Sequence, residues 1–519
     1  MRKLIGVGIL IVVGAVAMLA YYFWKPKAEE QMMEDTSAAS DMKGEIRVAL
    51  DNWVGYFPIR STQFKTKMRQ SGWNVKVTDD GADYHARMAA MDKDEYDFAV
   101  ATVDSDILNS AKYKFPGVIV MVIDESKGGD AIVARKSAGE SLNAFRGQHP
   151  RVAFTPDSPS HHLLKAAKSH FSLPELLPIK GSKERVETKG SSEALEKLKA
   201  GATDVAVLWE PDVSRALAIP GVIKLLGTEQ TEGYIVDVLL VNRNFLKEHK
   251  AEVKLFLSTY FRTLKWYSDN PEELKKDLAA ETKLSVQEVE QMIKGVSWVN
   301  LTQNCKKWFG ISAPNEERSE PMIVEAIEST VAILIDNGDF DKNPLPDSDP
   351  YKIFYTETLE ELYVRGEVGF AKAQDSPVMN SLETKFEQLK PEQWDRLAEV
   401  GTFKVEPIVF QSGTSRLTYE GKETLDSMAG SLKHFPNFRV RVSGHTSVDG
   451  DSEANKQLSF ARAESVVQYL IVTYAIDANR FQALGFGGEK PLPQFPDETE
   501  RGWSYRLPRV ELLLLKEEL

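Results

Sequence analysis

Short apolar strands alternate with amphipathic helices from Glu45 to about residue 370, and this alternation constrains the fold more than any other feature. The strand candidates are rich in β-branched and aromatic residues and are too short for helices. They are EIRVAL (45–50), DFAVAT (97–102), VIVMVI (118–123), RVAFT (151–155), DVAVLW (204–209) and VDVLLVN (236–242). The segments between these strands, such as residues 160–171 and 191–201, have the apolar periodicity of amphipathic helices. The pattern predicts α/β units with largely parallel sheets, in two lobes rather than one.

The first residues constrain the compartment. Met1-Arg2-Lys3 is basic, and no charged residue occurs from Leu4 to Trp24. At about 1.5 Å per residue this run spans roughly 30 Å, the thickness of a bilayer core. We therefore predict a signal-anchor helix (4–24) within residues 1–27, a single pass through the inner membrane and the bulk of the chain in the periplasm. The alternative is a cleaved signal peptide and a soluble periplasmic protein.

Composition excludes several other classes. Lys plus Arg number 64 against 77 Asp plus Glu, a net charge of −13, which disfavours nucleic acid as a partner. The one cysteine, Cys305, cannot form an internal disulfide, and His161 and His162 have no third ligand at metal spacing. The sequence also has no nucleophile elbow, P-loop or H-E-x-x-H motif. We expect a non-enzymatic protein without metal or cofactor.

The patterning divides the chain into five segments. The anchor (1–27) is followed by a polar linker (28–43), a two-lobed domain (44–371), a connector with one or two short helices (372–403) and a C-terminal domain (404–519). In the last of these we expect strands at 405–410, 438–444, 480–487 and 508–515, and helices at 417–435 and 452–474. This mixture predicts an α+β domain.

The C-terminal domain carries an ordered set of motifs. Gly444-His445-Thr446, Gly450, Asn455, Leu458-Ser459 and Arg462-Ala463 resemble the signature of the OmpA-like family. The flanking runs 410–413, 484–487 and 509–511 resemble the other motifs of that family, so the resemblance covers about residues 404–516. It implies a domain that docks onto peptidoglycan in a diderm, Gram-negative cell envelope.

The same motifs give candidate wall-binding residues, which are Ser447, Asp449, Asn455, Leu458 and Arg462. Asn455, Leu458 and Arg462 share a helix face, and an arginine can form two charge-assisted hydrogen bonds with a carboxylate. In the family, this arginine and a loop aspartate hold the diaminopimelate of the stem peptide. Ser447 stands where the family has that aspartate. Asp449 is a shifted replacement, or the site has weakened.

The middle of the chain resembles periplasmic solute-binding proteins of the nitrate, sulfonate, taurine and thiamine-precursor (NMT1-like) class of ABC transporters. The matching runs are Asp51–Tyr56, Asp97–Ala101, Gly128–Val133, Gly201–Val207 and Trp209-Glu210-Pro211. The resemblance implies a type II periplasmic-binding-protein fold whose lobes close over a ligand by hinge motion. The crossovers between the lobes should fall near 124–128 and 233–240.

Candidate ligand-binding residues lie where such sheets present loops, at strand ends and near the hinge. They are Trp53, Tyr56, Thr102, Asp104, Ser105, Asp130, Ser158, Ser160, Trp209, Glu210 and Asp237. Each type has an ordinary structural alternative: the serines as helix caps, the tryptophans as core aromatics and the acids as hinge ion pairs. Helix N-termini favour an anionic ligand, whereas the acids favour a cationic or zwitterionic one.

Together these features predict an inner-membrane-anchored solute receptor tethered to peptidoglycan, which binds a small anionic or zwitterionic metabolite. Its partners would be the solute, the stem peptide and an ABC permease or another envelope membrane complex. The alternative is an envelope scaffold in which the binding-protein fold serves as a spacer or an assembly interface. A motor stator subunit is disfavoured because Leu4–Trp24 contains no ionisable residue.

Overall fold

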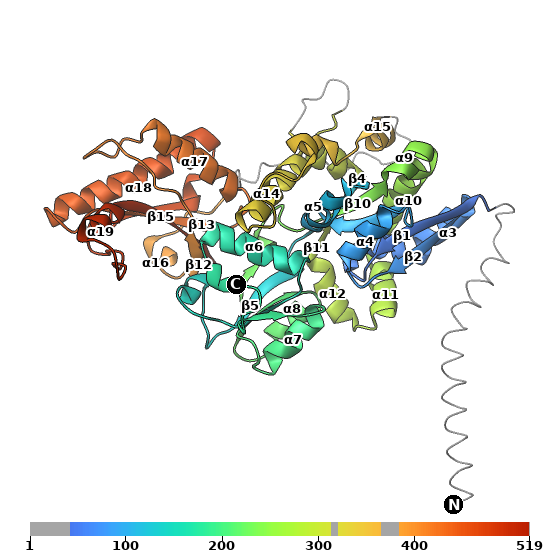
Figure 1. The fold of residues 1–519 in the computed structure, drawn as a ribbon, viewed down its shortest axis with the longest axis horizontal. Coiled ribbons are helices and arrows are strands. Elements are labelled where there is room, and N and C mark those ends of the chain that lie inside the picture. Colours follow the sequence, from blue (N-terminus) through green and yellow to red (C-terminus); the bar gives the residue numbers. More distant parts are fainter. Residues whose placement is uncertain (1–41, 313–319, 365–383, 518–519) are drawn as a thin grey trace, which may run out of the picture.

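The computed structural model describes residues 42–312, 320–364 and 384–517, which form three sheets with their helices (Figure 1). Two sheets belong to the two lobes predicted from the strand–helix alternation, and the third belongs to the C-terminal domain. In Figure 1 the C-terminal domain, drawn orange to red, lies beside the green second lobe and away from the blue first lobe. The predicted anchor at 4–24 and most of the linker after it lie outside the described residues. Among the helices that are described, none has both the length and the apolar character to cross a membrane.

Lobe 1 is built on a six-stranded sheet in the order β11-β4-β10-β3-β1-β2. Its strands are β1 (Gly44–Leu50), β2 (Trp73–Asp79), β3 (Phe98–Thr102), β4 (Gly117–Ser126), β10 (Val236–Asn242) and β11 (Val296–Trp298). Its helices are α2 (Phe57–Arg60), α3 (Thr62–Gln70), α4 (Tyr84–Met91), α5 (Val103–Ser110), α9 (Arg243–Glu248), α10 (Lys250–Asp269), α11 (Pro271–Thr282), α12 (Val286–Lys294), α13 (Leu301–Gln303), α14 (Met322–Asp336) and α15 (Glu357–Val364). The central strands β3, β4 and β10 are buried throughout, which explains why they are continuous apolar runs.

Lobe 2 has a five-stranded sheet in the order β7-β6-β8-β5-β9. Its strands are β5 (Asp130–Arg135), β6 (Val152–Phe154), β7 (Arg185–Glu187), β8 (Val205–Trp209) and β9 (Val222–Gly227). Its helices are α6 (Pro159–Phe171), α7 (Ser191–Lys199) and α8 (Asp212–Leu217). Short 3-10 turns complete the two lobes.

The chain crosses between the lobes twice, at 127–129 and at 228–235, close to the positions expected from the sequence. These crossings also correct one prediction, because the sheets are mixed rather than largely parallel. β10 runs antiparallel to both β3 and β4, and β5 runs antiparallel to both β8 and β9. The reason is the path of the chain: it leaves lobe 1 along β4 and returns along β10, so these neighbouring strands must point in opposite directions.

The C-terminal domain has a four-stranded sheet in the order β12-β15-β13-β14. Its strands are β12 (Ala398–Phe403), β13 (Arg439–His445), β14 (Phe481–Gly485) and β15 (Arg509–Lys516), and its helices are α16 (Pro391–Trp394), α17 (Tyr419–Leu432), α18 (Ser452–Tyr474) and α19 (Glu500–Arg506). Residues 405–410, predicted as a strand, form only an isolated bridge between Phe410 and Leu417. The edge strand is instead β12, within the segment predicted as a connector, and it gains its order by pairing with the leucine-rich β15.

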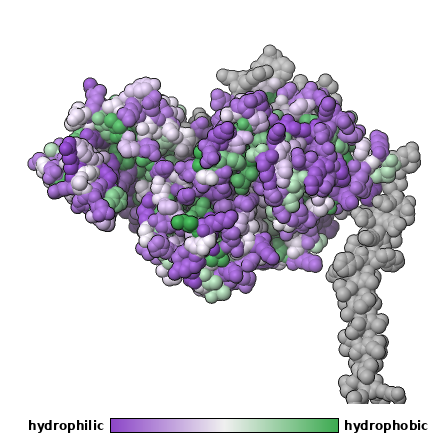
Figure 2. All heavy atoms as spheres, in the orientation of Figure 1, coloured by the Kyte–Doolittle hydropathy of each residue, from purple (hydrophilic) through white to green (hydrophobic). Residues whose placement is uncertain are grey.

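The C-terminal domain is packed directly on lobe 2, and the two share one apolar core. Phe435 lies 5.6 Å from Phe171 and 5.5 Å from Tyr234, measured between ring centroids. Gly401 of β12 is needed for this approach, because a Cβ there would lie 2.8 Å from Cδ1 of Phe171. The junction residues are buried, and the face of the molecule in Figure 2 is mostly hydrophilic with scattered apolar patches.

Hydrogen bonds reinforce this junction. Asn143 donates to the Thr402 hydroxyl (3.1 Å) and accepts from the Thr402 backbone N–H (3.0 Å). The second crossover takes part as well, because the N–H of Glu232 donates to the carbonyl of His434 (2.9 Å). The C-terminal domain therefore touches the segment that connects the two lobes.

Candidate functional site

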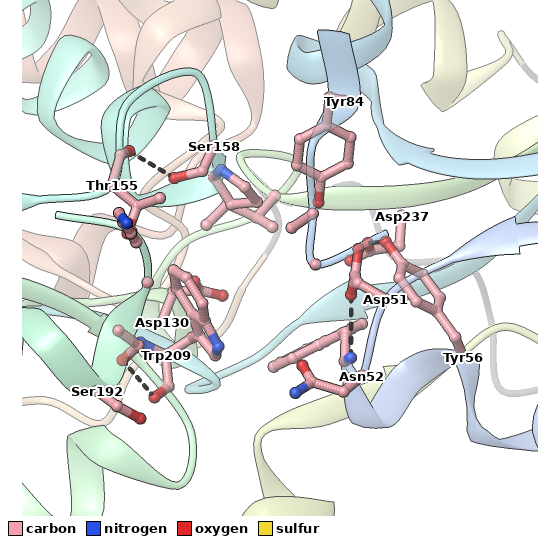
Figure 3. Close-up of a pocket in the computed structure, with 18 residues that line it drawn as sticks. Asp51, Asn52, Tyr56, Tyr84, Asp130, Thr155, Ser158, Ser192, Trp209 and Asp237 are labelled. Carbon is pink, nitrogen blue, oxygen red and sulfur yellow. Dashed lines mark hydrogen bonds between the residues drawn. The ribbon is translucent and has the colours of Figure 1, made fainter. Parts of the chain in front are cut away.

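A cavity of about 230 Å³ lies between the two lobes, and residues of both lobes and of the second crossover line it. Its lining residues are Asp51, Asn52, Trp53, Tyr56, Gly81, Ala82, Tyr84, Asp130, Thr155, Ser158, Pro159, Lys189, Gly190, Ser191, Ser192, Trp209, Ile235 and Asp237. In Figure 3 the labelled residues of lobe 2, with Asp130, face those of lobe 1 across an open gap. The lining comes from loops at the ends of β1, β2, β6, β7 and β8, so the cavity has the setting of a small-molecule site.

The lobe 1 wall is fixed by a buried arginine. Arg87 on α4 is fully buried, and its Nη2 donates to Oδ2 of Asp51 (3.1 Å). Its Nε donates to Oδ2 of Asp80 (2.7 Å), and its Nη1 donates to the Val100 carbonyl (2.7 Å). Asp51 in turn accepts from the Trp53 backbone N–H (3.0 Å), which positions the start of the loop that carries Trp53. Helix α4 therefore holds both Asp51 and, at its first residue, Tyr84 against the cavity.

Acidic side chains lie at the floor of the cavity, along the crossover strands. Tyr56 donates its hydroxyl proton to Oδ1 of Asp237. Asp124 is the cross-strand partner of Asp237, and Trp53 donates its indole N–H to Asp124 (3.2 Å). Burial raises the pKa of Asp237 and of Asp124 above the usual carboxyl range; repulsion from Asp124 adds to the shift at Asp237, and repulsion from Asp130 adds to the shift at Asp124. Burial also raises the pKa of Asp130 to about 7.

The lobe 2 wall also carries groups that attract negative charge. Helices α6 and α7 both begin at the cavity, and neither has a side-chain cap. The hydroxyl of Ser158 donates instead to the Thr155 carbonyl (2.7 Å), as Figure 3 shows. Lys189, which precedes α7, is the basic residue among those that line the cavity. Two sets of free backbone N–H groups and one ammonium make this wall a favourable place for an anionic group.

The structure separates the predicted ligand residues into two sets. The residues that line the cavity are Trp53, Tyr56, Asp130, Ser158, Trp209 and Asp237. The residues that do not line it are Thr102, Asp104, Ser105, Ser160 and Glu210. Their side chains point into local structure: Thr102 donates to Ser105 (2.8 Å), and Glu210 accepts from the hydroxyl of Ser214 (2.7 Å).

Several lining residues were not predicted, above all Asn52, Tyr84, Lys189 and Ser192. Lys189 and Ser192 follow β7, a strand of three residues whose sequence, Arg185–Glu187, has no apolar alternation. Tyr84 follows Asp83, which caps α4 by accepting from the Ala86 N–H (2.9 Å). That cap was a usable sequence signal for a helix start after β2.

His161 and His162 belong to α6 and are buried. Burial lowers the pKa of both imidazoles, and His161 lies 3.6 Å from the carboxylate of Asp157. Within the described ranges, no cluster of His, Cys, Asp and Glu has the arrangement of a metal site.

A second candidate site lies in the C-terminal domain, where α18 rests on β13 and β14. The approach is so close that a Cβ at Gly444 would lie 2.0 Å from the Ser459 carbonyl oxygen. Ser459 is buried, and its hydroxyl accepts from the Gly487 N–H (2.9 Å). The small residues of the sequence motifs therefore set the distance between helix and strands, and the polar residues are left at the rim.

The predicted wall-binding residues lie around this rim. Asn455 donates to the Asp449 carbonyl (2.8 Å), and Ser447 donates to the same oxygen (3.3 Å), so the loop is braced from both sides. Leu458 is half-buried rather than fully inward. Arg462 lies over the ring of Phe410 (5.2 Å) and donates through Nε to the Thr414 carbonyl (3.1 Å). Within the described residues it forms no ion pair with a carboxylate.

Comparison with known proteins supports a domain assignment. Residues 409–501 match the OmpA family, which confirms the resemblance found in the sequence, and the C-terminal domain is an OmpA domain. Outer membrane protein Omp38 of Acinetobacter baumannii is 30% identical over 100 residues, which are 19% of this chain and 28% of that protein. The peptidoglycan-associated lipoprotein of Rhizobium meliloti is 31% identical over 106 residues, 20% of this chain and 58% of that protein. The chain thus spans less than two thirds of the length of each of these relatives.

The two-lobed region was compared with solved structures. It is similar in fold to the periplasmic aliphatic sulphonate-binding protein SsuA from Escherichia coli, with a TM-score of 0.47 and 15% sequence identity. The match covers 61% of this chain and 99% of that protein.

Proposed function

We propose that the chain is a solute receptor of the bacterial cell envelope, held to the inner membrane at one end and to peptidoglycan at the other. The two lobes bind a small anionic or zwitterionic metabolite by closing over it. The uncharged run Leu4–Trp24 supports the membrane anchor, and the OmpA domain supports the periplasmic side. Transport of the solute would require an ABC permease or another envelope complex as a partner.

The observation that carries this proposal is the open cavity between the lobes. It is lined from both lobes and from the second crossover, so a bound molecule would bridge the surfaces that move in hinge closure. A spacer or assembly scaffold has no need to keep such a space, because apolar side chains would fill it and stabilise the fold. The free N-termini of α6 and α7 and the Lys189 ammonium support an anionic group on the solute.

Titration of the purified full-length chain against a library of small metabolites tests this function. We expect a ligand to bind with a measurable heat, and we expect Trp209→Ala to weaken it by about tenfold or more, because this ring forms one wall of the cavity. Tyr351→Ala removes an aromatic side chain that is 56% exposed and lies outside the cavity lining, so it should leave binding unchanged. Absence of binding across the library would favour the scaffold.

We propose further that the C-terminal domain holds the stem peptide through Arg462. Its guanidinium is half-buried yet has no carboxylate partner among the described residues, so it is available to a carboxylate of diaminopimelate. The Rhizobium meliloti relative is a peptidoglycan-associated lipoprotein, which is consistent with this role. Asp449 would then take the place of the family aspartate that Ser447 replaces.

Arg462→Ala should weaken binding of the full-length chain to purified sacculi by about tenfold or more, because a charge-assisted pair would be lost. Arg501→Ala removes an exposed arginine of the same domain, whose guanidinium lies over Tyr505, and should bind as the wild type does. Co-sedimentation of each variant with sacculi measures the effect. Equal sedimentation of the Arg462 and Arg501 variants would contradict the role of Arg462.

A further inference from the structure

The solute cavity contains more acidic than basic side chains. Asp51, Asp130 and Asp237 line it, against Lys189 alone. The charge of Asp51 is compensated by Arg87, but Asp130 and Asp237 have no cationic partner within the described residues. Both are almost completely buried, with 3% and 2% exposure. A cavity meant only for an anion would not place two uncompensated carboxyl groups in its lining, because each repels the ligand.

Asp130 has one oxygen available to a ligand. Its Oδ2 accepts from the hydroxyl of Ser126 (2.7 Å), whereas no described group donates to Oδ1. Its backbone N–H is held by the hydroxyl of Thr228 (3.2 Å), so the first residue of β5 is fixed between the two crossovers. Buried polar atoms are normally hydrogen-bonded, so a carboxyl oxygen at a cavity that lacks a donor in the protein can accept a hydrogen bond from a ligand.

Aromatic rings surround these acids. Trp53, Tyr56 and Tyr84 come from lobe 1, and Trp209 comes from lobe 2. Tyr84 is 5% exposed, its hydroxyl points towards the gap in Figure 3, and no described residue accepts from it or donates to it. Aromatic faces attract a cation that has been removed from water, and buried acids attract it more strongly.

Two regions of the cavity lining therefore differ in electrical character. The lobe 2 wall offers the N-termini of α6 and α7 together with Lys189, which suit an anionic group. Asp130 and Trp209, at the ends of the lobe 2 strands β5 and β8, lie in the same lining as Asp237 and the aromatic rings of lobe 1, and this second region suits a cationic group. The cavity of about 230 Å³ is small enough for one molecule to reach both regions.

We propose that the solute carries an ammonium group in addition to its anionic group, and that the ammonium lies between Asp130 and Asp237 against the rings of Trp53, Tyr84 and Trp209. This inference rests on the proposed receptor function and narrows its ligand to a zwitterion. It separates this chain from a receptor for simple inorganic or alkyl anions. The binding orientation follows: the anionic end faces the starts of α6 and α7, and the ammonium faces Asp130 and Asp237.

A proton-linked signature accompanies this binding mode. Burial raises the pKa of Asp130 to about 7, with Asp104 and Glu210 adding repulsion and Ser126 opposing it. Asp237, which faces Asp124, Asp130, Asp51 and the Tyr56 hydroxyl, also has a raised pKa. Of these two carboxyl groups, Asp130 is thus partly protonated at neutral pH in the empty cavity. An ammonium beside them stabilises the ionised forms, so binding near pH 7 should release protons.

Matched sets of probes test the proposal by calorimetry on the full-length chain. The sets are β-alanine, propionate and ethylamine; γ-aminobutyrate, butyrate and propylamine; and the aminoalkyl and alkyl sulfonates of the same lengths. We expect the zwitterion that fits best to bind about ten- to a hundredfold more tightly than its deaminated analogue, because one charge-assisted contact is lost with the amine. Repetition in buffers with different ionisation enthalpies should show proton release with the zwitterion and none with the anion.

Asp130→Asn provides the matching variant, because its amide oxygen can still accept from Ser126 and its size is unchanged. It should remove the preference for the zwitterion and leave the affinity for the anion unchanged or improved. Asp204→Asn, at the opposite end of β8 and paired with Arg151, should behave as the wild type does. Unchanged unfolding midpoints show that both variants fold.

The outcomes separate the two levels of the proposal. If an alkyl anion binds as tightly as its zwitterionic analogue, or if Asp130→Asn keeps the preference, the ammonium site is wrong while the receptor function stands. If a metabolite from the wider library binds without carrying an ammonium group, the ammonium site is likewise wrong and the receptor function stands. If no probe and no compound of the library binds, both the ammonium site and the receptor function are wrong.

Discussion

Phe435→Ala should destabilise the protein by about 3–5 kcal/mol, because it removes a fully buried ring from the core that lobe 2 and the OmpA domain share. The ring packs within 5.3–5.6 Å of Phe403, His170, Phe171 and Tyr234, measured between centroids. Those neighbours come from both sides of the junction, so they cannot collapse into the space without separating the two domains. We expect one shared unfolding transition of lobe 2 and the OmpA domain to shift, rather than that of the OmpA domain alone.

Denaturant unfolding followed by fluorescence and by calorimetry measures this effect. Tyr419→Ala is a suitable control, because that side chain belongs to the same domain and is 78% exposed. It should change the free energy of unfolding by less than about 0.5 kcal/mol. A Phe435→Ala protein that loses only the OmpA transition, with lobe 2 unchanged, would contradict the shared core.

Arg87→Met should cost a similar amount, about 3–5 kcal/mol, because it leaves Asp51 and Asp80 buried without their cation. In the wild type, burial raises the pKa of Asp80 while its bonds to Arg87 lower it. Without the guanidinium, burial and repulsion from Asp51 are opposed only by the hydrogen bond from the Ala82 N–H, so the folded-state pKa of Asp80 moves further above its unfolded value. A carboxyl group of this kind destabilises the fold as pH rises through its folded-state pKa.

The stability lost in Arg87→Met should depend on pH in a definite direction. The stability deficit of Arg87→Met should be largest near pH 7 and should shrink as the pH is lowered towards about 4, where the carboxyl groups become protonated. Arg151→Met breaks the exposed pair with Asp204 and should cost at most about 1 kcal/mol, so its deficit can change by no more than this small amount between the two pH values. Urea unfolding at pH 7 and at pH 4.5 compares the two. A deficit for Arg87→Met that grows on acidification would contradict the assignment.

Arg87 also connects stability with binding, because it holds Asp51 and the start of α4 against the cavity. A solute that binds the folded protein should therefore recover part of the lost stability by mass action. The contacts of Arg87 could not be predicted from the sequence. The residue lies within an ordinary amphipathic helix, and its two acidic partners come from the ends of β1 and β2. Such a contact depends on the register of three elements, which no local pattern specifies.

The parts of the fold that the sequence predicts well are those with strong local signals. β10 occupies the predicted residues 236–242, because an unbroken apolar run of this length is typical of a buried strand. α18 occupies the predicted residues 452–474, because a helical repeat of apolar residues over this length is typical of a long helix. The OmpA assignment was equally secure, because its motifs contain the small residues Gly444, Ser459 and Gly487, whose spacing reflects close packing of helix on strand.

The parts that failed depend on contacts between distant residues. β12 has the sequence AEVGTF, with a glycine in its interior, and becomes a strand only because β15 and the surface of lobe 2 are there to receive it. The junction itself was predicted as a connector for the same reason. At the cavity, residues at the ends of strong strands were predicted, such as Trp209 and Asp237, whereas Lys189 follows a strand too short to detect.

The junction also changes how the receptor should be studied. Because Phe171 and Phe435 belong to one core, isolated lobes would expose apolar surface that the OmpA domain normally covers. The contact between Glu232 and His434 places the OmpA domain against the second crossover, only a few residues from Ile235 and Asp237 of the cavity lining. Binding measurements therefore belong on the full-length chain.

The central claim is that the cavity between the lobes binds a small solute, and a crystal structure of the full-length chain, grown with the best ligand from the library, tests it most directly. The account predicts density for one molecule between Tyr84 and Trp209, with its anionic group at the start of α6 or α7 and its ammonium beside Asp130. A cavity that remains empty at saturating ligand, or ligand density elsewhere on the surface, would contradict it.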